Sequence, residues 1–421
     1  MNDKQEKAAL SGIRVLDLTE GGCMIGGKMF ADSGADVIKI EPPEGSPSRV
    51  GPYYKNIVAP EKSLYWFAFN TNKRGVTLDL FKPEGQVLFK QLASTADIII
   101  ESLGLGYLDS VKLGYADLAK VKPDIIYASV TPFGQTGPKA NLKGTDLTAL
   151  ASGGFLNACG DPDRAPVWIG FPQTSLFAGA EAAIGSMTAY WYRLTTGEGQ
   201  FVDVSMQESN MSANMNSLQM WDMNKVEFNR VGAVSYVAAT RVKQPIYFRC
   251  KDGYVMILAL GGNLPYVPSS ENLVKWMQES GMCPDWLAKL DWWKDYNAAV
   301  LKQDLADKVG KAIEAFTLTK TKDELYEEGA FSKFILIAPV SSTRDISNDI
   351  QLKARNYWVK VPHPELGESL PYCGPFVPMT ETPPIPTRRA PLIGEHNREI
   401  YLTELGISEA DLKQHKNKGI I

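Results

Sequence analysis

Four carboxylic acids lie close in the sequence to a serine that could do chemistry, all between residues 146 and 181. The serine is Ser175, within the segment Gly170–Gly179. The acids are Asp146, Asp161, Asp163 and Glu181. A serine hydroxyl needs a base before it can attack a carbonyl carbon, whereas an ionised carboxylate can attack directly. The segment therefore offers two chemistries, and only the carboxylates need no further partner.

The chain has little histidine to supply such a base, and no histidine lies near position 175 in the sequence. Its three histidines all lie near the C-terminal end, at His363, His396 and His415. A surface or packing role is the simplest interpretation of each. The five cysteines are widely separated and include no Cys-x-x-Cys pair, so neither a disulfide framework nor a zinc site is predicted.

Composition argues against several classes of partner. The 421 residues carry a formal charge of −4, which disfavours nucleic acid and anionic membranes. Hydrophobic residues make up 44% and charged residues 22%, as in a soluble protein with a large core. No apolar stretch is long enough to span a bilayer, and the N-terminus is polar. We expect a cytoplasmic protein that binds neither nucleic acid nor membrane.

The elements that position Ser175 follow an α/β pattern. A strand over Ile13–Leu18, a glycine-rich turn over Gly21–Gly27, a helix to Ala35 and a strand over Asp36–Glu41 form a βαβ unit. Such a crossover favours a parallel sheet. Further strands are expected over 76–80, 97–101 and 125–130, with helices over 83–96 and 115–120. The pattern predicts a Rossmann-like domain.

A dinucleotide site is the first alternative that this fold suggests. Glu41 ends the second strand at a plausible spacing for a ribose hydroxyl. The turn over Gly21–Gly27 does not give Gly-x-Gly-x-x-Gly in the required frame. A strand-ending acid before Pro42 is more often a turn residue, so we do not predict nicotinamide binding.

The second half of the chain has a different character. Asp203–Phe228 is rich in methionine, which either fills gaps in a core or forms an adaptable wall for an apolar acyl group. A β-hairpin is expected over 245–260, turning at Asp252-Gly253. Helices follow through Phe316, over 319–331 and over 408–416. We expect a large domain over 1–225, a smaller α/β domain over 226–335, and a C-terminal return to the large domain over 336–421.

Four blocks in order carry a family resemblance. They are Gly34–Pro43, Asn70–Arg74, Lys122–Pro138 and Gly394–Asn397. Together they resemble the class III CoA-transferases, the family of the formyl-CoA and carnitine enzymes. The resemblance implies a Rossmann-like large domain with a smaller α/β domain, in a dimer whose two chains interlock. It also implies that a CoA thioester and a carboxylic acid are the substrates, with no permanently bound cofactor.

The same resemblance assigns roles to individual positions. In the family a carboxylate nucleophile stands where this chain has Ser175, so the expected nucleophile is missing. Contacts with CoA are implied for Gly21, Gly22, Cys23, Leu78 and Lys143. The chain departs from the family again at Ser102–Leu103, in place of Asn-Phe, and at Ser110, in place of an arginine. Gly144-Thr145-Asp146 replaces the Gly-His-Asp triplet of the racemase branch, so racemisation is not expected.

Three hypotheses follow from the missing nucleophile. The chain is the silent subunit of a heteromer with an Asp-bearing paralogue, and its likeness is greatest to a branch that acts on benzylsuccinate in anaerobic aromatic degradation. Alternatively it is an active homodimeric CoA-transferase or acyl-CoA lyase that uses Asp146, Asp161, Asp163 or Glu181. As a third possibility it binds CoA without a catalytic partner. Asp161 and Asp163 flank Pro162 in an expected turn, which favours a solvated role for both.

Overall fold

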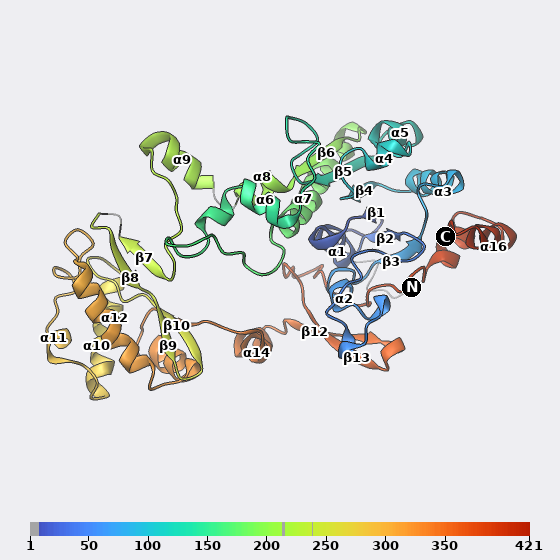
Figure 1. Cartoon of the computed structure of the whole chain (residues 1–421). Coiled ribbons are helices and arrows are strands. Elements are labelled where there is room, and N and C mark those ends of the chain that lie inside the picture. Colours follow the sequence, from blue (N-terminus) through green and yellow to red (C-terminus); the bar gives the residue numbers. More distant parts are fainter. Residues whose placement is uncertain (1–7, 213–214, 238) are drawn as a thin grey trace. The chain divides into compact units, whose positions relative to one another are not determined.

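The computed structural model describes residues 8–212, 215–237 and 239–421 (Figure 1). These residues form two compact units. The first contains the described residues of Met1–Leu156, Trp168–Glu227 and Ile350–Ile421. The second contains those of Asn157–Val167 and Phe228–Asp349. The expected domain boundaries at residues 225 and 335 stay predictions.

A parallel sheet of six strands forms the centre of the first unit, in the order β3-β2-β1-β4-β5-β6. The strands are β1 (Arg14–Leu18), β2 (Asp36–Glu41), β3 (Arg74–Thr77), β4 (Ile98–Glu101), β5 (Ile126–Thr131) and β6 (Phe201–Ser205). This arrangement confirms the predicted α/β class. The sixth strand was not expected from the sequence, yet β6 pairs with β5 from Phe201 opposite Tyr127 to Ser205 opposite Thr131.

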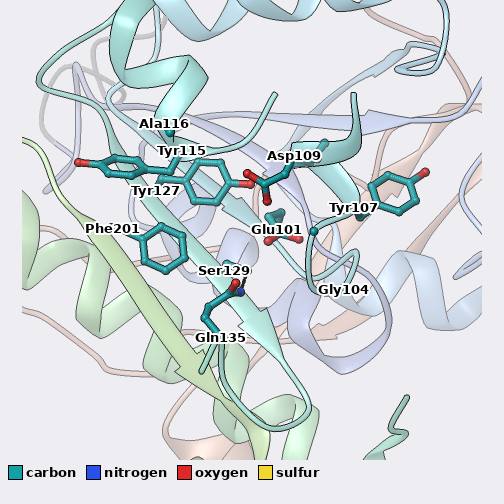
Figure 2. A pocket seen from close by; sticks show the side chains of 12 residues that line it. Glu101, Gly104, Tyr107, Asp109, Tyr115, Ala116, Tyr127, Ser129, Gln135 and Phe201 are labelled. Carbon is teal, nitrogen blue, oxygen red and sulfur yellow. Dashed lines mark hydrogen bonds between the residues drawn. The ribbon is translucent and has the colours of Figure 1, made fainter. Parts of the chain in front are cut away.

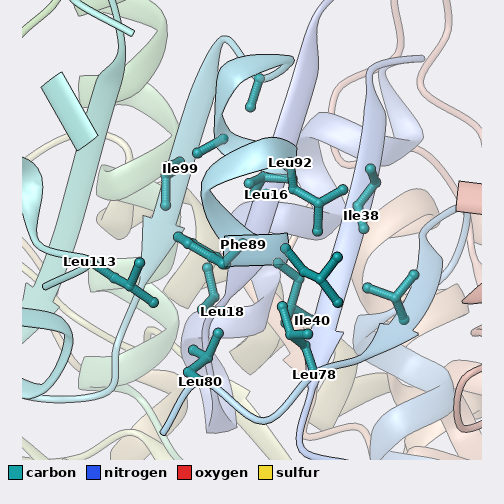
Figure 3. Close-up of a cluster of buried hydrophobic side chains, with 14 of the residues drawn as sticks. Leu16, Leu18, Ile38, Ile40, Leu78, Leu80, Phe89, Leu92, Ile99 and Leu113 are labelled. Atoms are coloured by element: carbon teal, nitrogen blue, oxygen red, sulfur yellow. The ribbon is translucent and has the colours of Figure 1, made fainter. Parts of the chain in front are cut away.

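Helices cover both faces of this sheet. On one face α3 (Pro83–Ser94) packs Phe89 and Leu92 against Leu16 and Ile38 of the strands (Figure 3). On the other face lie α1 (Met24–Asp32) and α7 (Thr174–Thr196). They pack against the strand residues that alternate with those of the first face, such as Val15, which precedes Leu16. Successive strand residues point to opposite faces, so a strand buried on both sides reads as a continuous apolar run.

Further elements complete the first unit. The helices are α2 (Leu64–Phe69), α4 (Tyr107–Ser110), α5 (Tyr115–Val121), α6 (Asp146–Ser152), α8 (Met206–Ser212), α9 (Met215–Asn224), α15 (Ile350–Ala354) and α16 (Glu409–Asn417). An antiparallel pair joins β12 (Trp358–His363) to β13 (Glu368–Cys373). The strand expected over 76–80 begins earlier, at Arg74, and ends at Thr77. Beyond it the Leu78 N–H still donates to the Glu41 carbonyl of β2 at 2.7 Å, but the Asp79 N–H donates to the Ile420 carbonyl at 2.7 Å, so the chain turns from the sheet to the C-terminal segment at Asp79.

The second unit has its own core of helices and short strands. Its strands are β7 (Val234–Val237), β8 (Val242–Pro245), β9 (Tyr247–Cys250), β10 (Gly253–Ile257) and β11 (Ile337–Pro339). Its helices are α10 (Tyr266–Glu279), α11 (Asp285–Ala288), α12 (Gln303–Thr317), α13 (Lys322–Tyr326) and α14 (Thr343–Asn348). The predicted hairpin is present, but Cys250 pairs with Gly253, so its turn is Lys251–Asp252. The helix expected over 319–331 begins at Lys322 and continues as π-helix over Glu327–Ser332.

The methionine-rich segment is largely exposed. Met206 is 8% exposed within the core, but Met215 is 67% and Met223 is 78% exposed. The core-filling interpretation is therefore wrong for these two residues of α9. In the described parts of the chain, no helix has the length and apolarity needed to cross a membrane.

Candidate functional site

The order of the strands places a switch point between β1 and β4. From β1 the chain proceeds outward to β2 and β3, and it returns to the other side of β1 as β4. In open parallel sheets, ligands bind in the crevice at the carboxyl ends of the strands beside such a point. Here the segment after β1 meets the segment after β4, because the Glu20 N–H donates to the Ser102 hydroxyl at 2.8 Å.

The N-terminus of α7 lies against this crevice. A Cβ atom added at Gly22 would lie 2.3 Å from the Ser175 hydroxyl oxygen and 3.1 Å from the Leu176 nitrogen. One at Gly26 would lie 2.5 Å from the Gly179 carbonyl oxygen. Only a residue without a side chain permits this close approach at either position. The glycine-rich turn after β1 therefore places Gly22 directly beside Ser175.

Ser175 and Asp146 form one hydrogen-bonded unit. The Ser175 hydroxyl donates to Asp146 Oδ1 at 2.8 Å, and the Ser175 N–H donates to the same oxygen at 2.7 Å. The Gln173 N–H donates to Oδ2 at 3.1 Å. Asp146 thus caps the first turn of α7, where a negative charge is favourable. Ser175 itself is 6% exposed.

The other three acids of the sequence cluster lie elsewhere. Glu181 accepts hydrogen bonds from the hydroxyls of Ser209 and Ser212 of α8. Asp161 and Asp163 belong to the second unit, where Asp161 is partly exposed, Asp163 is exposed and both pair with Arg164. Of the four acids, Asp146 alone is hydrogen-bonded to Ser175. Twenty-nine residues separate the two in the sequence, so only the tertiary structure identifies this pair.

The five positions expected to contact CoA have different surroundings. The Gly21 N–H donates to the Ser48 hydroxyl at 2.8 Å, and an added Cβ there would meet no atom within 4 Å. Burial raises the pKa of Cys23 to about 12, so its thiol stays neutral at pH 7. Leu78 is 2% exposed in the hydrophobic core, whereas Lys143 is exposed. The roles of all five stay predictions.

A buried charge cluster supports the loop after β1. Lys73 donates to Asp17 Oδ2 at 2.7 Å and to the Met24 carbonyl at 3.0 Å. Lys39 donates to the Thr19 carbonyl. Burial alone would raise the pKa of Asp17, but Lys39 and Lys73 hold it below its usual range. Two ammonium groups thus anchor both ends of the loop, a role that the positions of Lys39 and Lys73 in the sequence do not indicate.

The dinucleotide alternative gains no support from Glu41. Its carboxylate is 1% exposed and binds Arg49 through two hydrogen bonds of 2.6 and 2.7 Å. Both oxygens are therefore engaged inside the protein and not presented to a ribose. Among the described residues, the side chains of histidine, cysteine, aspartate and glutamate form no group of three that could hold a metal ion.

Known proteins match this chain over most of its length. A family model described as CoA-transferase family III matches residues 10–397. Over 399 residues the chain is 36% identical to succinyl-CoA:(R)-benzylsuccinate CoA-transferase subunit BbsE of Thauera aromatica, covering 94% of each. Over 427 residues it is 30% identical to formyl-CoA:oxalate CoA-transferase of Streptomyces coelicolor, covering 98% of this chain and 99% of that one.

A solved structure has the same fold. The CAIB/BAIF family protein from Brucella suis superposes with a TM-score of 0.81 at 27% identity, covering 94% of this chain and 99% of that chain. The likeness therefore extends over both compact units.

Proposed function

Because the chain belongs to CoA-transferase family III, we propose that it is the catalytically silent subunit of a heteromeric CoA-transferase. Such an enzyme moves CoA from an acyl-CoA donor to a carboxylic acid acceptor, and CoA enters as the thioester substrate. The partner is a paralogous chain with an aspartate at the position of Ser175. Cytoplasmic location stays a prediction.

The reaction explains why the residue at position 175 matters. A carboxylate that attacks the thioester forms a mixed anhydride and releases CoA thiolate. Attack of the thiolate on the carbonyl of the enzyme's own side chain then releases the first acid and leaves an enzyme–CoA thioester. The acceptor acid takes CoA from that species. A serine has no carbonyl in its side chain, so an acyl-serine ester cannot hold CoA.

The hydrogen bond from the Ser175 hydroxyl to Asp146 Oδ1, at 2.8 Å, is the observation that carries this proposal. The Asp146 carboxylate already accepts three hydrogen bonds, two of them from the backbone N–H groups of Gln173 and Ser175 at the start of α7. Hydrogen bonds to the charged form stabilise a carboxylate and lower its nucleophilicity. The site thus has a hydroxyl where the carboxylate is needed and a carboxylate that serves as a helix cap.

The substrate pair follows from the relative in Thauera aromatica, whose name describes one subunit of a succinyl-CoA:(R)-benzylsuccinate enzyme. We propose succinyl-CoA and a benzylsuccinate-like acid as donor and acceptor. In an interlocked pair the silent chain lines the partner's site. Gly21, Gly22, Cys23, Leu78 and Lys143 are the residues we assign to CoA.

The composition of the native complex tests the proposal. The chain is purified gently from its own host cells and measured by native mass spectrometry. We expect a second chain of similar mass with an aspartate in the matching segment. We also expect CoA transfer from succinyl-CoA only by the pair. A homodimer that catalyses the transfer alone would overturn the silent-subunit assignment.

A second candidate is an active homodimer in which Asp146 is the nucleophile. Its proximity to Ser175 favours it over Asp161, Asp163 and Glu181. The variant Asp146→Asn would then abolish transfer by the isolated chain, whereas Glu181→Gln would not. If the isolated chain binds CoA but transfers none, and no second chain is found, the third hypothesis holds.

A further inference from the structure

A pocket with a volume of about 230 Å³ lies beside β4, β5 and β6 in the first unit (Figure 2). It is formed by the end of β4, the middle of β5, the start of β6, the loop between β4 and α4, and the first residues of α4 and α5. The lining residues are Glu101, Gly104, Gly106, Tyr107, Leu108, Asp109, Tyr115, Ala116, Tyr127, Ser129, Gln135 and Phe201. None of them is among the residues assigned above to CoA or to the Ser175 site.

The more buried of the two acids that line the pocket is Glu101. Glu101 is 4% exposed, and its Oε2 accepts the Leu103 N–H at 2.7 Å. Ser129 also donates to this carboxylate, while the Ser129 hydroxyl accepts from the Gln135 amide at 2.8 Å. Both of these donors to Glu101 are neutral. A carboxylate has about four acceptor sites, so Glu101 keeps capacity for another donor.

A second carboxylate, that of Asp109, lies at the exposed rim. Figure 2 shows both acids between Tyr107 on one side and the rings of Tyr115 and Tyr127 on the other. Within the described chain, no lysine, arginine or histidine forms an ion pair with either acid, although many other carboxylates of this unit have such a partner. Burying a carboxylate without a cation is costly. The pocket therefore lacks positive charge.

The wall opposite Tyr107 is aromatic. The rings of Tyr127 and Phe201 stack, with their centroids 5.7 Å apart and their planes at 20°. The ring centroid of Tyr115 lies 5.6 Å from that of Phe201. None of these rings has a described lysine or arginine over its face. Aromatic faces attract cations, and planar cations such as guanidinium also stack on them.

The remaining wall leaves the pocket open. Gly104 and Gly106 have φ values of +102° and +71°, and a Cβ added at either would meet no atom within 4 Å. The loop thus follows a path that glycine favours, with free space beside it.

We propose that this pocket binds a small planar organic cation of the guanidinium or amidinium class. Glu101 binds its N–H groups at the base, Asp109 attracts it at the rim, and the Tyr127 and Phe201 wall packs against it. A planar cation fits better than a compact ammonium because two carboxylates and a flat wall match a fork of N–H groups. This assignment does not depend on the silent-subunit proposal.

The probe for a binding test is methylguanidinium, and N-methylurea is its neutral planar counterpart. Binding to the full chain is measured by isothermal titration calorimetry at pH 8. We expect methylguanidinium to bind with a Kd of roughly 1 mM, a typical value for so small a ligand. N-methylurea and methylammonium should bind at least about tenfold more weakly, a difference of roughly 1.4 kcal/mol.

Variants locate the binding. Glu101→Gln keeps the shape of the side chain and should weaken methylguanidinium binding at least about tenfold. Asp109→Asn, at the exposed rim, tests the site without disturbing the core and should weaken binding as well. Asp117→Asn is the matched control, because Asp117 is a partly exposed acid of α5 next to the lining residue Ala116 and pairs with Lys120. Equal binding of N-methylurea, or unchanged affinity in both pocket variants, would overturn the proposal.

Discussion

Ser175 and Asp146 are linked through one carboxylate oxygen, which accepts both the hydroxyl and the N–H of the serine at 2.8 and 2.7 Å. The contact joins the first residue of α6 to the first turn of α7. A longer acidic side chain at position 175 would therefore bring a second negative charge to a place already occupied by one.

Replacing Ser175 with aspartate should make stability depend on pH. Two carboxylates that share a site cannot both ionise without repulsion, so the pKa of one of them rises. We expect Ser175→Asp to be destabilised more at pH 8 than at pH 5.5, in urea denaturation. Ser175→Ala is the control, with a loss of about 1 kcal/mol at both pH values from the missing hydrogen bond. A penalty for the aspartate that is equal at both pH values would contradict the shared-site geometry.

The role of Asp146 as a helix cap predicts a stability loss that is independent of catalysis. Replacing a capping residue with alanine costs about 1–2 kcal/mol. We therefore expect Asp146→Ala to lower the free energy of unfolding by that amount, measured by chemical denaturation. Asp163→Ala, at an exposed position in the second unit, should leave it nearly unchanged. The cap assignment fails if the two variants are equally stable.

Gly22 should be intolerant of any side chain because of its contact with Ser175. Gly22→Ala would place a Cβ 2.3 Å from the Ser175 oxygen, and such overpacking costs about 1–3 kcal/mol. Removing that oxygen relieves part of the clash. We expect the double variant Gly22→Ala/Ser175→Ala to be more stable than the sum of the single losses predicts, in a double-mutant cycle. Additive losses would show that the two residues do not touch.

Glu101 should reduce stability at high pH. Burial raises its pKa from 4.5 to about 7, despite the hydrogen bonds from Ser129 and Leu103. The folded protein therefore holds a proton that the unfolded chain has lost, so stability falls as pH rises from about 4.5 to 7 and stays lower above that range. Glu101→Gln removes this cost. Of the titratable groups near it, the Asp109 carboxylate also favours the neutral acid. Burial holds the pKa of the Tyr127 phenol well above its usual range, so Tyr127 stays uncharged over these pH values.

The measurement is the free energy of unfolding of both proteins at pH 4.5 and pH 8. Relative to the native chain, Glu101→Gln should gain on the order of 3 kcal/mol between the two pH values. Asp117→Asn should show no such gain, because its carboxylate is partly exposed and paired with Lys120. A Glu101→Gln difference that is constant with pH would mean that Glu101 is ionised in the folded protein at both values.

The sequence alone determined the class of fold and the family. Strands buried on both faces read as apolar runs, and glycine and proline mark their ends, so the βαβ pattern from Ile13 to Glu41 could be read locally. The four family blocks identified the relatives, and the position of Ser175 within its segment raised the question of the missing nucleophile.

Only the tertiary structure decided which groups meet. Strand β6 is defined by its pairing with β5, some seventy residues earlier, and a short run such as Phe201–Ser205 does not specify that partner. Likewise, Asp146 is one of four candidate acids in the sequence, and folding places α6 against the start of α7. Local backbone preferences depend on neighbouring residues and can therefore be predicted from the sequence. Contacts between distant segments depend on how the elements pack in three dimensions, and the sequence alone does not predict those contacts.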